Sequence, residues 1–245
     1  MSNNNQKDRL YAQPINGLGQ FAFDANVARV FPDMISRSVP GYAAVTEMIG
    51  VLAGKYAQAN SRCYDLGCSL GAVTQILLER IEQPHCHIIG VDNSPAMVER
   101  CCELLNRPPH AHTAEIICAD VRDIHIERAS LVVMNFTLQF IEPDARLDVL
   151  RAIYQGLLPG GAFVLSEKIQ FQDTEQQQDF SELHVEFKRS HGYSELEISQ
   201  KRAALENVLI AEPVEQHIQR LRDAGFSRVY LWFQCLNFVS FLAIK

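Results

Sequence analysis

The feature that most constrains the fold is a glycine-containing stretch, residues 64–71 (YDLGCSLG), followed by Asp92 at the end of a second apolar run. Gly67 lets the backbone turn sharply out of a strand, and Gly71 lets a ligand lie close to the following helix. In an open α/β sheet the carboxyl ends of neighbouring strands face one crevice, where Asp92 can accept hydrogen bonds from ribose hydroxyls. The pattern predicts a nucleotide site in a parallel sheet. The glycines alone also fit a tight strand-to-helix turn, and Asp92 also fits a helix N-cap.

The composition of this loop limits which nucleotide can bind. Its glycines are spaced as Gly67-x-x-x-Gly71, which differs from the Gly-x-Gly-x-x-Gly pattern of dinucleotide sites. Asp65 precedes them, and its carboxylate would repel a pyrophosphate, whereas it can hold an ammonium group directly or through water. A ligand that combines an adenosine, a positively charged sulfur and an amino acid therefore fits best.

Composition and charge favour a small-molecule substrate. The chain has 245 residues, 47% of them hydrophobic and 21% charged, which suffices to bury one sizeable core. Its formal net charge is -7 and it has no Lys/Arg-rich run, so direct nucleic-acid binding is not expected. The first residues form no apolar signal core, and no run of about 18 apolar residues occurs. We therefore expect a cytoplasmic protein that does not contact membranes.

The cysteines and histidines do not indicate a metal site. The seven cysteines are scattered, mostly in apolar settings, without a CxxC motif or a Cys/His ligand spacing, and we interpret them as reduced and mostly structural. His184, His191 and His217 also lack a metal-binding spacing, and a solvent-exposed position is expected for each. No metal is therefore predicted.

Strand-like and helix-like segments alternate from residue 62 onward, as in a doubly wound parallel sheet. Strands are expected at 62–66, 87–92, 114–119, 130–136 and 162–166, and helices at 72–81, 95–105, 144–157 and 214–224. A tight turn is predicted at 158–161, and the apolar runs 228–233 and 237–244 can pair only as an antiparallel hairpin. A mostly parallel sheet closed by such a hairpin is typical of the α/β, Rossmann-like class I S-adenosylmethionine-dependent methyltransferase fold.

Two helical segments lie outside this alternation. Residues 1–60 begin with about 20 polar residues, which we expect to be mobile, and continue in two helical stretches joined by a loop at 37–42 that can fold over the crevice. Residues 170–212 are long, polar and helical and are expected to form an inserted lid. The prediction is a single domain, with the ligand-binding α/β unit at 61–245 and segment 1–60 closing over the site.

Further candidate site residues follow the later strands. Asp120 can accept from an adenine amine and the Val121 backbone N–H can meet a ring nitrogen, although a plain loop carboxylate is also compatible with Asp120. Asn135 ends an apolar strand, where an unpartnered amide would cost about 1 to 3 kcal/mol, so we expect it to line the pocket. Glu167 and Lys168 either approach the site or form a pair of charges at the sheet edge.

Longer motifs resemble one family more closely than the fold requires. Residues 37–42 (RSVPGY) and 191–202 (HGYSELEISQKR) lie outside the nucleotide motifs and are specific. Residues 30–35 (VFPDMI), 135–140 (NFTLQF) and 231–235 (LWFQC) extend the similarity over nearly the whole chain. The chain is similar to the carboxy-S-adenosyl-L-methionine synthases, which supply the carboxymethyl donor for 5-carboxymethoxyuridine at the wobble position of transfer RNA.

The resemblance implies a reaction, partners and ligand contacts. S-adenosyl-L-methionine and prephenate give carboxy-S-adenosyl-L-methionine and phenylpyruvate, and the product passes to a tRNA uridine carboxymethyltransferase. Aromatising prephenate could supply both the electrophile and a base, in agreement with the lack of an evident His or Lys base in the sequence. The resemblance also implies a homodimer. With Asp65 added from the argument above, the expected cofactor-binding residues are Tyr42, Asp65, Gly67, Cys68, Ser69, Asp92, Asn93, Asp120, Val121, Asn135 and Arg202.

Arg202 is the expected catalytic residue, because a guanidinium can bind the new carboxylate through two hydrogen bonds whereas a methyl group offers it nothing. From the residues alone a solvated helix face is favoured, with Glu197–Lys201 and Arg202–Glu206 as i,i+4 pairs. The resemblance favours the carboxylate role. Two other functions stay open: an ordinary methyltransferase for a small acid or RNA, and a non-catalytic carrier of an S-adenosylmethionine derivative.

Overall fold

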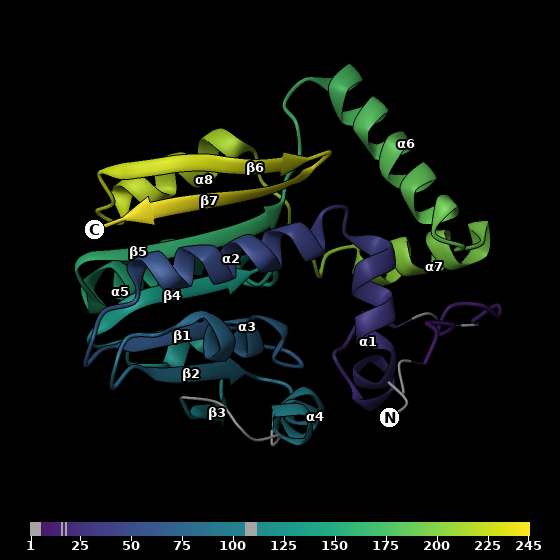
Figure 1. Cartoon of the computed structure of the whole chain (residues 1–245). Helices are drawn as coiled ribbons and strands as arrows, with labels where there is room; N and C mark the ends of the chain where they lie inside the picture. The colour runs from purple at the N-terminus through teal and green to yellow at the C-terminus, as the bar shows by residue number, and fades with distance from the viewer. Residues whose placement is uncertain (1–5, 16, 18, 106–111) are drawn as a thin grey trace.

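The computed structural model describes residues 6–15, 17, 19–105 and 112–245, and these form one twisted sheet with helices on both faces (Figure 1). The strand order is β3-β2-β1-β4-β5-β7-β6, parallel from β3 to β5, with β7 antiparallel to both β5 and β6. The strands are β1 Arg62–Leu66, β2 His87–Asp92, β3 Ala114–Cys118, β4 Ala129–Asn135, β5 Leu157–Lys168, β6 Arg228–Cys235 and β7 Phe238–Ile244. The predicted fold class and hairpin are confirmed.

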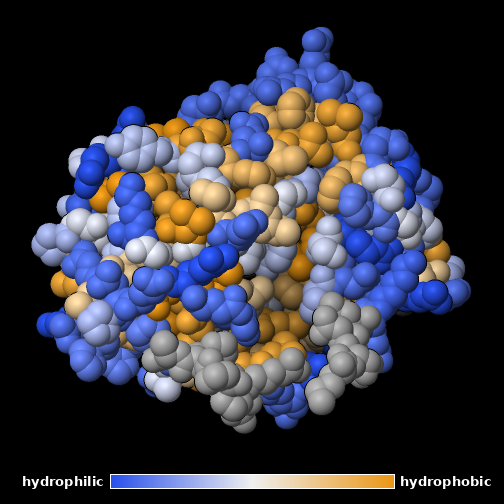
Figure 2. Space-filling model, viewed as in Figure 1, coloured by the Kyte–Doolittle hydropathy of each residue, from blue (hydrophilic) through white to orange (hydrophobic). Residues whose placement is uncertain are grey.

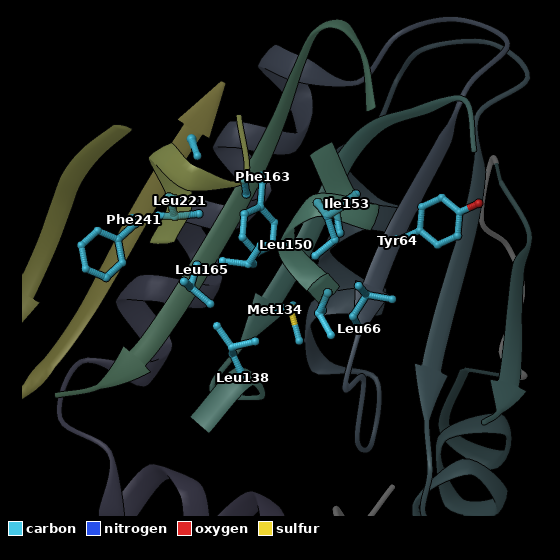
Figure 3. Packing of buried hydrophobic residues seen from close by; sticks show 14 of the residues in the cluster. Tyr64, Leu66, Met134, Leu138, Leu150, Ile153, Phe163, Leu165, Leu221 and Phe241 are labelled. Carbon is cyan, nitrogen blue, oxygen red and sulfur yellow. The ribbon is translucent and has the colours of Figure 1, made fainter. Parts of the chain in front are cut away.

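Two apolar layers hold the helices to the sheet. Along β4 the side chains alternate: Leu131 and Val133 join the cluster that buries α2 (Tyr42–Tyr56) and α3 (Ala72–Arg80). Val132 and Met134 join the opposite cluster, which buries α5 (Pro143–Gly156) and α8 (Val214–Asp223). Figure 3 shows side chains from β1, β4, β5, β7, α5 and α8 converging in that second cluster. A fifth helix, α4 (Pro95–Leu105), packs on β2 and β3.

The turn predicted at 158–161 is wrong, because these residues belong to β5. The pairing steps from Ala129↔Leu157 to Leu131↔Ala162, so the extra residues form a bulge rather than a break. The bulge is held from the other side, where the Gly160 and Lys245 backbone N–H groups donate to Lys245 and Gly161 carbonyls at 3.2 and 3.0 Å. Gly160 has φ +74°, which explains the glycine here.

The inserted lid is a pair of helices, α6 (Thr174–Ser190) and α7 (Glu195–Leu205), which lies beside α1 (Ala25–Ser38) beyond the carboxyl ends of the parallel strands (Figure 1). A capping box between Ser194 and Glu197 starts α7. No helix of the described residues is long and apolar enough to span a bilayer.

Several parts of segment 1–60 border the crevice, namely Phe21 and Phe23, α1, Val39 and the first turn of α2. The rest of α2 packs on the sheet through Val45, Ile49 and Ala53. The start of the chain packs on the lid within the described part. Asp8 is buried and accepts from the Tyr193 hydroxyl, and the Gln200 amide donates to the Tyr11 carbonyl at 3.0 Å.

Candidate functional site

A cavity of about 380 Å³ opens where the strand order reverses, between the carboxyl ends of β1 and β4 and the lid. Ligands bind at this switch point in doubly wound sheets. The cavity brings together ten of the eleven predicted site residues: Tyr42, Asp65, Gly67, Cys68, Ser69, Asp92, Asn93, Asp120, Val121 and Asn135. The eleventh, Arg202, lies elsewhere.

The loop after β1 has the geometry that its glycines suggested. Gly67 has φ +84°, and a Cβ there would collide with the Thr137 side chain, which follows β4. The backbone N–H groups of Gly67 and Cys68 donate to the Val91 carbonyl at 2.7 and 2.9 Å, which ties this loop to β2. The loop is therefore pinned between two neighbouring strands, with the backbone exposed to the cavity.

Asp92 is fixed by two backbone N–H donors, one to each carboxylate oxygen. Ser69 donates to Oδ2 and Ser94 to Oδ1, both at 2.9 Å. The helix N-cap is Ser94, whose Oγ accepts from the Met97 N–H at 3.2 Å, so the cap alternative for Asp92 is wrong. The Asp92 carboxylate lines the cavity and retains further lone pairs for hydroxyl donors there. Burial raises the pKa of Asp92, and the two N–H donors oppose that rise.

Asp65 lies deeper, at 1% exposure, and accepts a 2.7 Å hydrogen bond from the Thr74 hydroxyl. Burial is the main cause that raises the pKa of Asp65 to about 7, with the nearby Asp92 charge adding to it. A cationic ligand placed here would recover the ionised form.

Three further predicted residues, Asp120, Asn135 and Tyr42, line the cavity. Asp120 caps the turn after β3, and the Arg122 guanidinium donates to both of its oxygens at 2.9 and 2.7 Å, which lowers the pKa of Asp120. The sequence argument did not foresee this pair. The Asn135 Oδ1 is buried without a hydrogen-bond partner among the described residues, as expected for an acceptor that pairs with a bound ligand. Tyr42 is the first residue of α2, and its ring packs against that of Phe136. Burial raises the pKa of Tyr42 to about 12.

The sequence argument missed a basic wall opposite these acids. Lys168, His184, Lys188 and Lys201 line the cavity from β5, α6 and α7. Of the alternatives for Lys168, the site position is therefore correct. Lys188 and Lys201 gave no sequence signal, because only the folded lid turns them inward.

Several residues expected at the surface are buried. His184 donates from Nε2 to the Ser38 carbonyl at 2.8 Å, and His217 packs against Phe241 with ring centroids 5.7 Å apart, so the exposed position holds only for His191. Burial lowers the pKa of His184 to about 3 and that of His217 to about 4, so both rings are neutral. Glu167 is fully buried on the other face of β5 and is no edge charge.

Arg202 does not reach the cavity of its own chain. Its side chain is exposed on α7, in a hollow that it shares with Gln178, Glu182 and Arg189 of the lid. Its charge is nevertheless close enough to lower the pKa values of Lys168 and Lys188. A direct contact with a ligand in the cavity would therefore need a different subunit or a movement of the lid.

The hydrogen-bond acceptors of the cavity suit an organic cation. Within the ranges that the structure describes, no three His, Cys, Asp or Glu side chains form a group that could hold a metal ion. The orphaned Asn135 oxygen, the buried Asp65 and the paired acceptors of Asp92 fit an amino-acid nucleoside with a positive sulfur. The aromatic residues Phe136, Phe140 and Phe238 supply apolar wall for flat rings.

Comparisons with known proteins agree with this fit. Residues 64–161 match the model of a methyltransferase domain. Human N-acetylserotonin methyltransferase, solved with S-adenosylmethionine, superimposes with a TM-score of 0.59 at 15% identity, covering 90% of this chain and 55% of that one. A Leishmania major S-adenosylmethionine-dependent methyltransferase gives a TM-score of 0.59 at 15% identity, covering 91% and 79%. At these identities the likeness shows the fold alone.

Two curated relatives are similar over almost their whole length, and both are named carboxy-S-adenosyl-L-methionine synthase. The protein from Trichlorobacter lovleyi is 56% identical over 97% of this chain and 98% of its own. That from Pseudomonas aeruginosa is 54% identical over 98% and 99%. The chain is therefore an S-adenosyl-L-methionine-dependent transferase that belongs to the carboxy-S-adenosyl-L-methionine synthase family.

Proposed function

We propose that this protein converts S-adenosyl-L-methionine and prephenate to carboxy-S-adenosyl-L-methionine and phenylpyruvate. The observation that carries the proposal is the division of the cavity into an acidic wall, with Asp65 and Asp92, and a basic wall, with Lys168, Lys188 and Lys201. An ordinary methyltransferase site needs the first wall for its cationic cofactor. The second wall supports a second, anionic substrate.

The atoms and charges of this reaction balance. S-adenosyl-L-methionine supplies a methyl group whose protons are acidified by the adjacent positive sulfur. Prephenate, a dianion, loses its ring carboxyl group as carbon dioxide and its ring hydroxyl as hydroxide, and becomes the phenylpyruvate monoanion. The carbon dioxide ends on the methyl carbon, and the hydroxide leaves as water with one methyl proton. The residues of the cavity hold both molecules and exclude water while this exchange takes place.

The basic side chains do not need to act as the proton acceptor, because prephenate itself releases hydroxide. The proposal is tested by mass spectrometry of the small molecules formed from S-adenosyl-L-methionine with and without prephenate. A carboxylated product that requires prephenate supports it. Transfer of a methyl group to prephenate or RNA, or binding without turnover, would favour the alternatives of a methyltransferase or a carrier.

The raised pKa of Asp65 leads to a pH prediction. Only the ionised carboxyl attracts the ammonium of the cofactor, so affinity for S-adenosyl-L-methionine should rise about tenfold or more between pH 5.5 and 7.5, across the pKa of about 7. The folding stability of the ligand-free protein should change with pH in the opposite direction. Because the pKa of Asp65 is higher in the folded than in the unfolded protein, its contribution to stability falls as pH rises from about 4 to 7.

Calorimetric titration at several pH values would measure this rise. Asp65→Asn should flatten it. Asp120→Asn is the matched control. The hydrogen bonds from Arg122 lower the pKa of Asp120, so this carboxyl group titrates below pH 5.5. An unchanged rise in the Asp65→Asn protein would exclude Asp65 as its source.

We extend the proposal to a homodimer in which Arg202 serves the cavity of the partner. Arg202 is exposed and outside its own cavity, which supports a role in trans. Exposed apolar side chains on α2, α6 and β6, namely Met48, Val51, Leu183 and Leu231, offer surface for such a contact. Figure 2 shows apolar residues gathered on this face between the tip of α6 and the sheet.

Arg202→Ala should weaken binding of carboxy-S-adenosyl-L-methionine by at least about tenfold more than binding of S-adenosyl-L-methionine, because only the former offers a carboxylate for two charge-assisted hydrogen bonds. Arg222→Ala, at an exposed arginine of α8, is the control. Equal losses for both ligands would contradict the assigned role.

Mixing variants would separate action in cis from action in trans. A dimer of one Arg202→Ala subunit and one Asp92→Ala subunit has one complete site only if Arg202 acts across the interface. Mixing two inactive variants should then restore activity. If Arg202 acts in its own subunit, the mixture stays inactive.

The product of this reaction is an activated carboxymethyl donor, and we include in the proposal its delivery to a cytoplasmic tRNA uridine carboxymethyltransferase. The net charge of -7 argues against tRNA binding by this chain itself. A lack of tRNA retention in a gel-shift assay at low salt is therefore the expected result.

A further inference from the structure

The wall formed by β5, α6 and α7 concentrates positive charge inside a chain of net charge -7. Lys168 ends β5, Lys188 lies in the last turn of α6 and Lys201 lies on α7. Three separate elements, labelled in Figure 1, therefore contribute lysines to the lining of one cavity. Partly buried cations are costly unless each has an anionic partner. The partners of each cation therefore decide what this wall can bind.

Two of the nearby cations already have a partner. The Lys201 Nζ donates to the Ser38 Oγ at 2.9 Å and lies 3.7 Å from the Asp8 carboxylate. Arg37 pairs with Asp33 at 2.9 Å. These two positive and two negative charges balance one another, and they fix the N-terminal segment and α1 against the lid.

Lys168 and Lys188 have no such partner. Over the described ranges, neither ammonium group takes part in an ion pair within 4.0 Å. Burial and the charges of Lys168, Lys201 and Arg202 lower the pKa of Lys188 to about 7. Burial and the charge of Arg202 lower the pKa of Lys168. The neighbouring His184 is neutral and adds no charge.

We propose that Lys168 and Lys188 form the subsite that binds the two carboxylates of a dianionic co-substrate, opposite the acidic strand ends that receive the cationic donor. This inference rests on the function proposed above and specifies which side chains recognise the second substrate. Two lysines without an ion-pair partner match two negative charges, and a bound dianion favours the protonated form of both. The apolar side chains of Phe136 and Phe238 line the same cavity and offer contact to the ring between the carboxylates.

Binding can be measured without turnover. The protein is saturated with S-adenosylhomocysteine, which lacks the methyl group and so cannot react, and is titrated with prephenate. Lys168→Met and Lys188→Met remove the charge while keeping the length of the side chain. Each should raise the prephenate Kd at least about tenfold, and the Arg variants at the same positions should recover part of the loss. Lys55→Met, at an exposed lysine near the far end of α2, is the matched control.

The affinity for S-adenosylhomocysteine is the second readout and should stay within about threefold of wild type, which also shows that the variants are folded. Loss of that affinity would assign the lysine to the methionyl carboxylate of the donor and overturn the proposal. So would unchanged prephenate binding in both Met variants of a protein whose wild type makes carboxy-S-adenosyl-L-methionine. If the wild type neither binds nor consumes prephenate, it is the proposed function that fails.

Discussion

Asp92→Ala is expected to weaken S-adenosyl-L-methionine binding at least about 100-fold. The wild-type carboxylate is held in place by the Ser69 and Ser94 N–H groups and faces the cavity, where it can accept from the ribose hydroxyls. Hydrogen bonds to a charged group contribute about 1.5 to 3 kcal/mol each, and alanine removes both while leaving the two N–H donors unpaired. Isothermal titration calorimetry measures the affinity directly.

Asp148→Ala is a suitable control for this substitution, because the Asp148 side chain is 81% exposed on α5 and pairs with Arg151 at 3.4 Å. It should bind like wild type. Asp92→Asn keeps the shape of the side chain and one hydrogen-bond acceptor, so its affinity for S-adenosyl-L-methionine should lie between those of Asp92→Ala and wild type. An Asp92→Ala protein that binds within about threefold of wild type, with an unchanged melting temperature, would show that the ribose is held elsewhere.

Glu212→Ala should lower the free energy of unfolding by about 3 to 5 kcal/mol, the loss typical of breaking a buried ion pair. Glu212 is 5% exposed and accepts from both Arg146 and Arg220, the latter through both of its oxygens. Arg146 is fully buried and also donates to the Ile210 carbonyl at 2.9 Å, so this network fixes the return of the chain from the lid to the sheet. Without Glu212, two buried guanidinium groups lose their counter-charge.

Urea unfolding followed by circular dichroism gives this value, and the melting temperature should fall by about 6 to 20 °C. Glu99→Ala, at an exposed glutamate of α4, is the control and should change stability by less than about 0.5 kcal/mol. Replacing the whole network with Arg146→Met, Glu212→Leu and Arg220→Met should cost less than the single change, because no charge is then left buried. A loss below about 1 kcal/mol for Glu212→Ala would contradict the account.

The strand ends of the site could be predicted because local chemistry marks them. Gly67 needs a positive φ, Asp92 ends a β-strand shortly before a helix, and Asn135 interrupts an apolar run. Each signal lies within a few residues of the side chain that carries it, and the alternation of strands and helices then sets the order of the sheet. The family resemblance added Tyr42, which no local pattern indicates.

The basic wall could not be predicted in this way, because it depends on how the lid packs. The sequence placed Glu197 and Lys201 as a solvated i,i+4 pair. In the structure both are buried: Glu197 closes the capping box of α7, and Lys201 turns inward to Ser38 and Asp8. The same limit applies to His217 and Glu167, whose burial follows from helix and strand packing far away in sequence. Polar composition alone therefore underestimated how much charge this chain encloses.

The most direct test of the central claim is mass spectrometry of the small molecules formed when the purified protein is incubated with S-adenosyl-L-methionine, with and without prephenate. The account predicts a species heavier than S-adenosyl-L-methionine by one carbon dioxide, formed only with prephenate and accompanied by an equal amount of phenylpyruvate. Consumption of S-adenosyl-L-methionine to S-adenosylhomocysteine, or binding with no new species in either reaction, would contradict it.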